Sequence, residues 1–147
     1  PEEEGIVIAY TSIYGNTKKA VLALADALKA KGCPKVVVND LARCDMAEAV
    51  EDAFRHDKLV VASSTYDGGL FPCMEDFLSH LKAKNYQKRT VALMENGSWA
   101  PMAAKKMSAI LEEMKDITIC EPTVTIRSAM NDANLEVMET LCENLRK

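Results

Sequence analysis

Short, continuous apolar runs alternate along this chain with longer segments whose apolar residues recur at helical spacing. A short uninterrupted apolar run is typical of a strand that is buried on both faces of a sheet. Such runs predict strands at Gly5–Tyr10, Val36–Val38, Leu59–Ala62, Thr90–Met94 and within Ile117–Ile126. Helical spacing, with Gly and Pro as stop and start signals, predicts helices at Asn16–Lys31, Met46–Arg55, Pro72–Lys84, Pro101–Lys115 and Asn131–Leu145.

Five strands, each followed by a helix, predict an α/β fold: a doubly wound five-stranded parallel sheet with helices on both faces. The expected strand order is 2-1-3-4-5, which places the switch point of the topology between the first and third strands. Ligands of open parallel sheets bind beyond the carboxyl ends of the strands at such a point. We therefore look for functional residues in the loops after the first, third and fourth strands.

Length and charge narrow the classes of function. The 147 residues predict a single domain, 1–147. The formal net charge is −4, whereas a nucleic-acid-binding domain has a basic face. No apolar run approaches the roughly 18 residues that cross a bilayer. The start, Pro-Glu-Glu-Glu-Gly, resembles neither a signal peptide nor a transit peptide, and a start without Met suggests a processed chain or a piece of a longer one. We expect neither nucleic-acid nor membrane partners.

Cysteine and histidine usage predicts reduced thiols and no metal site. Five cysteines at wide spacings, without a C-x-x-C pair, are typical of a cytoplasmic chain rather than of a disulfide framework. Neither His56 nor His80 has a Cys or a second His at metal-ligand spacing. Cys73 stands at a predicted helix start, a place that can lower the pKa of a thiol, although such a residue is more often a small buried side chain.

The loop after the first strand is rich in hydroxyl and amide groups and directly precedes a helix. It comprises Thr11, Ser12, Ile13, Tyr14, Gly15, Asn16 and Thr17. A helix N-terminus offers free backbone N–H groups and a positive dipole end, so this loop predicts a phosphate site without a cation. It matches neither the Walker pattern nor the dinucleotide fingerprint. The alternative is that these residues only cap the helix.

The loop after the third strand is polar, then glycine-rich, then apolar. It comprises Ser63, Ser64, Thr65, Tyr66, Asp67, Gly68, Gly69, Leu70, Phe71 and Pro72. A planar heterocycle needs polar contacts at its edge and apolar contacts at its faces, and this loop supplies both. The alternative is a tight turn built on Asp67-Gly68.

The loop after the fourth strand, Glu95–Pro101, contains Trp99, the single Trp of the chain. A Trp in a loop that faces a ligand is a candidate for stacking, although a lone Trp more often packs into a core. Together the three loops predict an anion site, a glycine-rich edge contact and an aromatic wall at one end of the sheet.

These segments resemble known flavin-binding sequences. Thr11–Thr17 is similar to the flavodoxin phosphate loop T-x-x-x-G-N-T, which binds the phosphate of FMN. Ser64–Pro72 resembles the S-P-T-x-N-N-G-x-x-P segment of flavodiiron proteins, although the usual Pro is absent and Asp67 and Gly68 replace the two Asn residues. Gly97-Ser98-Trp99 resembles part of their G-S-Y-G-W-S segment. The resemblance implies a flavodoxin-like domain of the kind that follows the diiron domain in that family.

The resemblance also implies a role for each loop. The phosphate would be held by Thr11, Ser12, Ile13, Tyr14, Gly15, Asn16 and Thr17. The flavin ring would be bordered by Ser64, Thr65, Tyr66, Asp67, Gly68 and Gly69, with Asn96, Gly97 and Ser98 at its polar edge and Trp99 over one face. None of these is a catalytic group, because the flavin carries the chemistry. Reduction leaves the flavin anionic, so the carboxylates of Asp67 and Glu95 should make the last electron harder to add.

By this resemblance, the chain is an FMN-binding electron carrier that passes electrons one at a time. The donor would be a rubredoxin-like protein or a flavin reductase, and the acceptor the diiron centre of an oxygen or nitric oxide reductase. In such a parent protein, a homodimer would bring the flavin to the metal site of the other subunit.

Other interpretations remain open. They are a stand-alone short-chain flavodoxin, an FMN-dependent NAD(P)H:quinone or azo reductase, and a docking module without cofactor. The reductases usually need insertions that build a substrate pocket, whereas the loops here are short. A receiver domain shares the sheet order but needs acidic residues where this chain has Thr11-Ser12 and Ser63-Ser64. The pairs Lys18-Lys19 and Lys105-Lys106 are either solvated helix faces or part of a docking surface for an acidic partner.

Overall fold

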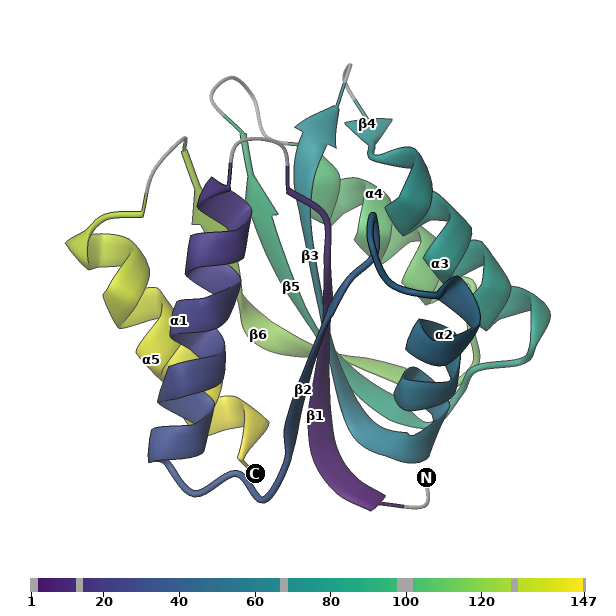
Figure 1. Ribbon diagram of the computed structural model, residues 1–147, viewed down its shortest axis with the longest axis horizontal. Coiled ribbons are helices and arrows are strands. Elements are labelled where there is room, and N and C mark those ends of the chain that lie inside the picture. Colours follow the sequence, from purple (N-terminus) through teal and green to yellow (C-terminus); the bar gives the residue numbers. More distant parts are fainter. Residues whose placement is uncertain (1–2, 13–14, 67–68, 98–101, 128–129, 147) are drawn as a thin grey trace.

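A computed structural model describes residues 3–12, 15–66, 69–97, 102–127 and 130–146, and its strands and helices alternate (Figure 1). The strands are β1 (Glu3–Tyr10), β2 (Val36–Asp40), β3 (His56–Tyr66), β4 (Gly69–Leu70), β5 (Arg89–Asn96) and β6 (Ile117–Ile126). The helices are α1 (Asn16–Ala30), α2 (Met46–Arg55), α3 (Pro72–Ala83), α4 (Ala103–Glu112) and α5 (Asp132–Leu145). Every strand and helix predicted from the sequence is present, and β4 is an addition.

The sheet has the predicted topology. Its parallel strands follow the order β2-β1-β3-β5-β6, with β4 paired only to β3, so the expected order 2-1-3-4-5 is confirmed. Ile8 of β1 pairs with Val38 of β2 on one side and with Val60 of β3 on the other. The carboxyl ends of the parallel strands therefore lie at one edge of the sheet, at the top of Figure 1.

Helices cover both faces of the sheet: α1 and α5 pack on one face, and α2, α3 and α4 on the other (Figure 1). Alternate strand residues enter opposite layers, as the pleat requires. Val7 packs in the layer that contains Phe77 of α3, whereas its neighbour Ile8 packs in the layer that contains Leu24 of α1. Because both faces are buried, these strands are apolar along most of their length.

Four strands are longer than the sequence predicted: β1 begins at Glu3, β2 ends at Asp40, and β3 and β5 extend at both ends. β3 continues through Ser63, Ser64, Thr65 and Tyr66, and β5 includes Glu95 and Asn96; all six were predicted to lie in loops. Ser63 pairs with Glu95 and Ser64 with Asn96. The prediction was wrong here because hydrophobicity reports the burial of side chains, whereas backbone hydrogen bonds continue the strand pairing regardless of side-chain polarity.

A short hairpin follows β3. Thr65 and Tyr66 pair antiparallel with Leu70 and Gly69 of β4. Gly69 and Leu70 were also predicted to lie in a loop, and an isolated two-residue strand has no hydrophobic period that a sequence pattern could detect.

All five cysteines are free thiols. Burial raises the pKa of the Cys73 thiol above its ordinary value, so its position in the first turn of α3 does not make it a reactive thiolate. Within the described residues, no helix is long and apolar enough to span a bilayer, and no group of three or more His, Cys, Asp or Glu side chains could hold a metal ion.

Candidate cofactor site

Four hydroxyl side chains form two hydrogen-bonded pairs near the carboxyl ends of β1 and β3. Thr11, directly after β1, is 1% exposed, and its backbone N–H donates to the carbonyl of Ala62 at 3.0 Å. Its Oγ1 lies 2.9 Å from Oγ of Ser63. Thr17, in the first turn of α1, has its Oγ1 2.9 Å from Oγ of Ser64. These contacts connect the first predicted loop to the second.

The directions of these hydrogen bonds follow from the number of protons. Ser63 Oγ donates its single proton to the carbonyl of Ser64 at 3.0 Å, so Thr11 is the donor in its bond to Ser63. Thr17 and Ser64 have two hydroxyl protons and use one in their mutual bond. Among the described residues no acceptor takes the second proton of this pair, so it can be donated to a ligand atom such as a phosphate oxygen.

The start of α1 suits an anion. Its N-cap, Gly15, has φ 83°, a left-handed angle that glycine adopts at little cost. A Cβ at Gly15 would meet nothing within 4 Å, so the backbone angle, and not crowding, favours glycine there. The N-cap supplies no side-chain bond, and the first turn holds no acidic residue. The backbone N–H of Lys18 donates to Ser12 Oγ at 3.4 Å, which leaves the Ser12 proton for another acceptor. The positive end of the helix dipole therefore faces a loop that has hydroxyl donors.

The start of α4 is held by the ends of two strands. Thr65 Oγ1, on β3, accepts a hydrogen bond from the backbone N–H of Met102 at 3.0 Å. Glu95, on β5, accepts from the backbone N–H of Ala104 at 3.0 Å and from the Thr125 hydroxyl at 2.8 Å. Glu95 is only 8% exposed. The Glu95 carboxylate thus interacts with the positive end of α4, a role that the sequence did not indicate.

Asn96 and Gly97 lie at the same edge. Asn96 is the last residue of β5, is 8% exposed, and pairs in register with Ser64 and with Ile126. The backbone N–H of Gly97 donates to the carbonyl of Ile126 at 3.0 Å. Asn96 and Gly97, two of the residues predicted at the polar edge of the ring, are therefore neighbours of the Thr17–Ser64 pair through the sheet.

The structure brings together the predicted site residues that it describes. Those at the start of α1 are Thr11, Ser12, Gly15, Asn16 and Thr17, and those at the strand ends are Ser64, Thr65, Tyr66, Gly69, Asn96 and Gly97. Six others lie outside the described residues: Ile13, Tyr14, Asp67, Gly68, Ser98 and Trp99.

Sequence analysis missed two contributors. Ser63 was quoted in the second loop without a role, and Thr125 was taken as part of an apolar strand. Both are polar residues near the carboxyl end of a strand, the edge at which ligands of parallel sheets bind, and that position is the signal that could have identified them.

The fold and this edge define a flavodoxin-like α/β domain. Residues 7–128 match the flavodoxin domain family, and the chain belongs to this family. Membership implies a flavin cofactor and flavin-based electron transfer.

Two curated relatives are longer proteins. Rubredoxin-oxygen oxidoreductase of Megalodesulfovibrio gigas is 20% identical over 142 residues, which are 97% of this chain and 35% of that protein. Anaerobic nitric oxide reductase flavorubredoxin of Escherichia coli is 23% identical over 114 residues, which are 76% of this chain and 24% of that protein. The chain thus spans about a third or less of the length of these relatives.

Solved structures show the same fold. Rubredoxin oxygen:oxidoreductase from Desulfovibrio gigas superposes with a TM-score of 0.90 at 20% identity, covering 96% of this chain and 35% of that chain. A flavodoxin from the domain Archaea superposes with a TM-score of 0.81 at 21% identity, covering 99% of this chain and 100% of that chain. The flavodoxin-like fold expected from the sequence is confirmed.

Proposed function

We propose that the chain binds FMN at the carboxyl edge of its sheet and carries electrons one at a time. The observation that supports this most directly is the Thr17–Ser64 pair at the first turn of α1, where one of the two hydroxyl protons has no acceptor among the described residues. Hydroxyl and backbone donors at a helix N-terminus are suited to a phosphate group without any cationic side chain.

The donor set fits both parts of this cofactor. Ser12, Gly15, Asn16 and Thr17 would hold the phosphate, with Thr11, Ile13 and Tyr14 completing the loop. Ser64, Thr65, Tyr66, Asp67, Gly68 and Gly69 would border the ring, and Asn96, Gly97, Ser98 and Trp99 would meet its edge and face. When bound, FMN supplies the electron-transfer chemistry, and the residues of this chain bind and orient it.

The domain would serve a longer cytoplasmic oxidoreductase. Two relatives are named for oxygen and nitric oxide as substrates, and this chain corresponds to only a part of each. In this proposal, a redox donor, a rubredoxin-like protein or a flavin reductase, reduces the domain. Its electrons then pass to a diiron domain of the same protein, in which a homodimer would place the flavin next to the metal site of the other subunit.

Cofactor retention by the purified chain tests the proposal. FMN is added, the excess is removed by gel filtration, and the absorption spectrum is recorded. We expect one retained flavin per chain, and stepwise reduction should resolve two one-electron steps. A chain that retains no FMN would overturn the proposal and favour a docking module. Rapid turnover of reduced nicotinamide with a quinone would favour the reductase.

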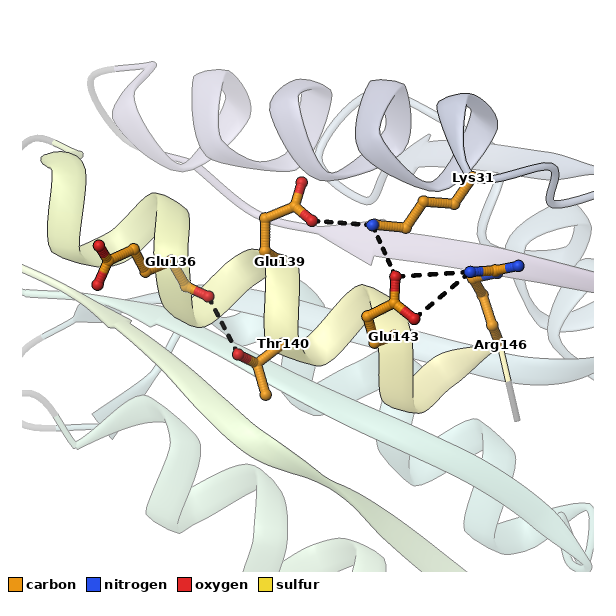
Figure 2. Close-up of polar contacts among 6 residues, drawn as sticks. All are labelled: Lys31, Glu136, Glu139, Thr140, Glu143 and Arg146. Atoms are coloured by element: carbon orange, nitrogen blue, oxygen red, sulfur yellow. Dashed lines mark hydrogen bonds and ion pairs between the residues drawn. The ribbon is translucent and has the colours of Figure 1, made fainter.

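A double variant tests whether the Thr17–Ser64 pair takes part in FMN binding. Thr17→Val with Ser64→Ala removes both hydroxyls of the pair, and we expect FMN binding to weaken about tenfold or more, since a hydrogen bond to a charged group contributes about 1.5–3 kcal/mol. The control, Thr140→Val with Ser79→Ala, removes the same groups from exposed positions on α5 and α3. Figure 2 shows Thr140 donating to the carbonyl of Glu136, a contact within α5. Equal weakening in both variants would contradict the assigned site.

A further inference from the structure

The first turns of the helices differ in charge. Acidic residues stand in the first turns of α2, α3 and α5: Glu48, Glu75 and Asp132. The first turns of α1 and α4 hold none. They carry instead the pairs Lys18-Lys19 and Lys105-Lys106. The two exceptional helices are the ones that directly follow the first and third predicted cofactor loops.

These four lysines form part of what we call the lysine rim, which also includes Arg127, the residue directly after β6. All five are exposed. Helical side chains lean toward the helix N-terminus, so the lysines extend toward the carboxyl edge of the sheet. Arg127 joins this edge because β6 ends at Ile126, whose carbonyl bonds to Gly97.

The rim is also unpaired. None of its members makes an ion pair within the described part of the chain. Lys31, at the other end of α1, provides the contrast: it pairs with Glu139 at 2.9 Å and with Glu143 at 2.7 Å (Figure 2). These carboxylates raise the pKa of the Lys31 ammonium.

Lysines in a first turn act against local helix stability, because a cation there is repelled by the positive end of the dipole. Residues that break a local rule in this way are expected at functional surfaces. The whole chain has a net charge of −4, so an acidic molecule is repelled by most of the surface and attracted at the rim.

Resting on the proposed function, we propose that the lysine rim is a docking surface for an acidic electron-transfer protein. The charge pattern favours encounters in which the partner faces the cofactor edge, and Glu48, Glu75 and Asp132 restrict the attraction to the sides of α1 and α4. In each productive encounter the partner is oxidised by one electron and the cofactor-loaded domain is reduced by one.

Stopped-flow reduction of the FMN-loaded chain by reduced rubredoxin of net negative charge, without oxygen, tests this surface. The rim variant combines Lys19→Glu, Lys105→Glu and Lys106→Glu. The control variant combines Lys29→Glu, Lys84→Glu and Lys115→Glu, which are exposed lysines away from that edge. Both triple variants change the net charge by the same amount, so only the place of the charge differs.

We expect the rim variant to react about tenfold more slowly at low ionic strength and to lose most of its salt dependence, since steering of this kind changes rates by about 10–1,000-fold. The control variant should stay within about threefold of the wild type, because its charges lie at or beyond the C-terminal ends of α1, α3 and α4, away from the edge, and Coulomb interactions weaken with distance. Equal slowing of both variants would overturn the proposal, because net charge would then explain the rate.

Three further outcomes separate the proposals. A wild-type chain that retains no FMN would overturn the proposed function before any rate is measured. Normal FMN retention with unchanged rates in the rim variant would overturn only the docking surface. Binding of anionic vesicles or single-stranded DNA that is lost in the rim variant, with rubredoxin rates unchanged, would also overturn it and assign the rim to that polyanion.

Discussion

Helix starts away from the candidate site and helix starts next to it are stabilised in different ways. α2 begins with Asp45, whose carboxylate accepts from the backbone N–H of Ala47 at 3.0 Å. α5 begins with a capping box in which Asn131 and Asn134 exchange hydrogen bonds of 2.9 and 3.0 Å. α1 begins at a glycine, and α4 obtains its acceptors from β3 and β5.

The difference shows that a helix start next to a ligand site lacks a side-chain cap of its own. A side-chain cap within the helix occupies the N–H groups and the positive dipole end that an anion would otherwise use. At α1 these groups are left to the loop, and at α4 two strand ends supply the missing acceptors. The four predictions below test this contrast, beginning with the largest expected effect.

Removing the carboxylate that accepts a hydrogen bond from the start of α4 should lower the free energy of unfolding more than removing the side-chain cap of α2. Glu95→Ala leaves a buried backbone N–H and the Thr125 hydroxyl without their charged acceptor, and we expect the free energy of unfolding to fall by about 3 kcal/mol. Asp45→Ala, the matched change at α2, should cost about 1 kcal/mol. Urea unfolding of both variants measures the difference. Similar losses would mean that the carboxylate of Glu95 is not the principal support of α4.

Ala substitutions at two glycines distinguish an effect of backbone strain from an effect on ligand binding. Gly15 and Gly32 have φ of 83° and 89°, and a Cβ at either would meet nothing within 4 Å. Replacement by Ala at either position should lower the free energy of unfolding by about 1–2 kcal/mol, because both angles are left-handed. Only Gly15→Ala should also weaken FMN binding, which a flavin titration measures. An equal loss of affinity in Gly32→Ala would show that strain alone reduces binding.

The charge of Glu95 should also be detectable in the reduction potential. Glu95→Gln keeps the shape and an acceptor oxygen but removes the negative charge, so the potential for the last electron should rise by an amount on the order of tens of millivolts. Glu136→Gln, an exposed change on α5, is the control for net charge. Potentiometric titration of the FMN-loaded variants compares them. The same potential in Glu95→Gln and the wild type would exclude this electrostatic role.

The smallest expected effect concerns the lysines. Lys19→Glu places an anion in the first turn of α1 and should raise the free energy of unfolding by about 0.5 kcal/mol, whereas Lys29→Glu in its last turn should lower it by a similar amount. Thermal unfolding at low salt measures both. A lower free energy of unfolding in Lys19→Glu would show that Lys19 does not destabilise the start of α1. The difference in charge between the helix starts would then not affect stability.

The location of the candidate site in the fold was predictable from the sequence. The three loops follow buried parallel strands, and Thr11–Thr17 leads into a helix, so the topology alone predicts all three at one edge of the sheet. Its hydrogen bonds were not predictable. Thr17 and Ser64 are 47 positions apart, and only the packing of α1 against β3 brings their hydroxyls to 2.9 Å.

The sequence by itself determined the order of strands and helices and the two-layer core, because continuous apolar runs and helical periodicity both report burial. Tertiary structure decided where β3 and β5 end, since backbone pairing extends through Ser63, Ser64, Glu95 and Asn96 whatever the polarity of their side chains. It also decided the role of Glu95, which was expected in a loop and instead bonds to α4 from within the sheet. A pattern records which residues avoid water, whereas the partner of a buried polar group depends on which chain segments the fold brings together.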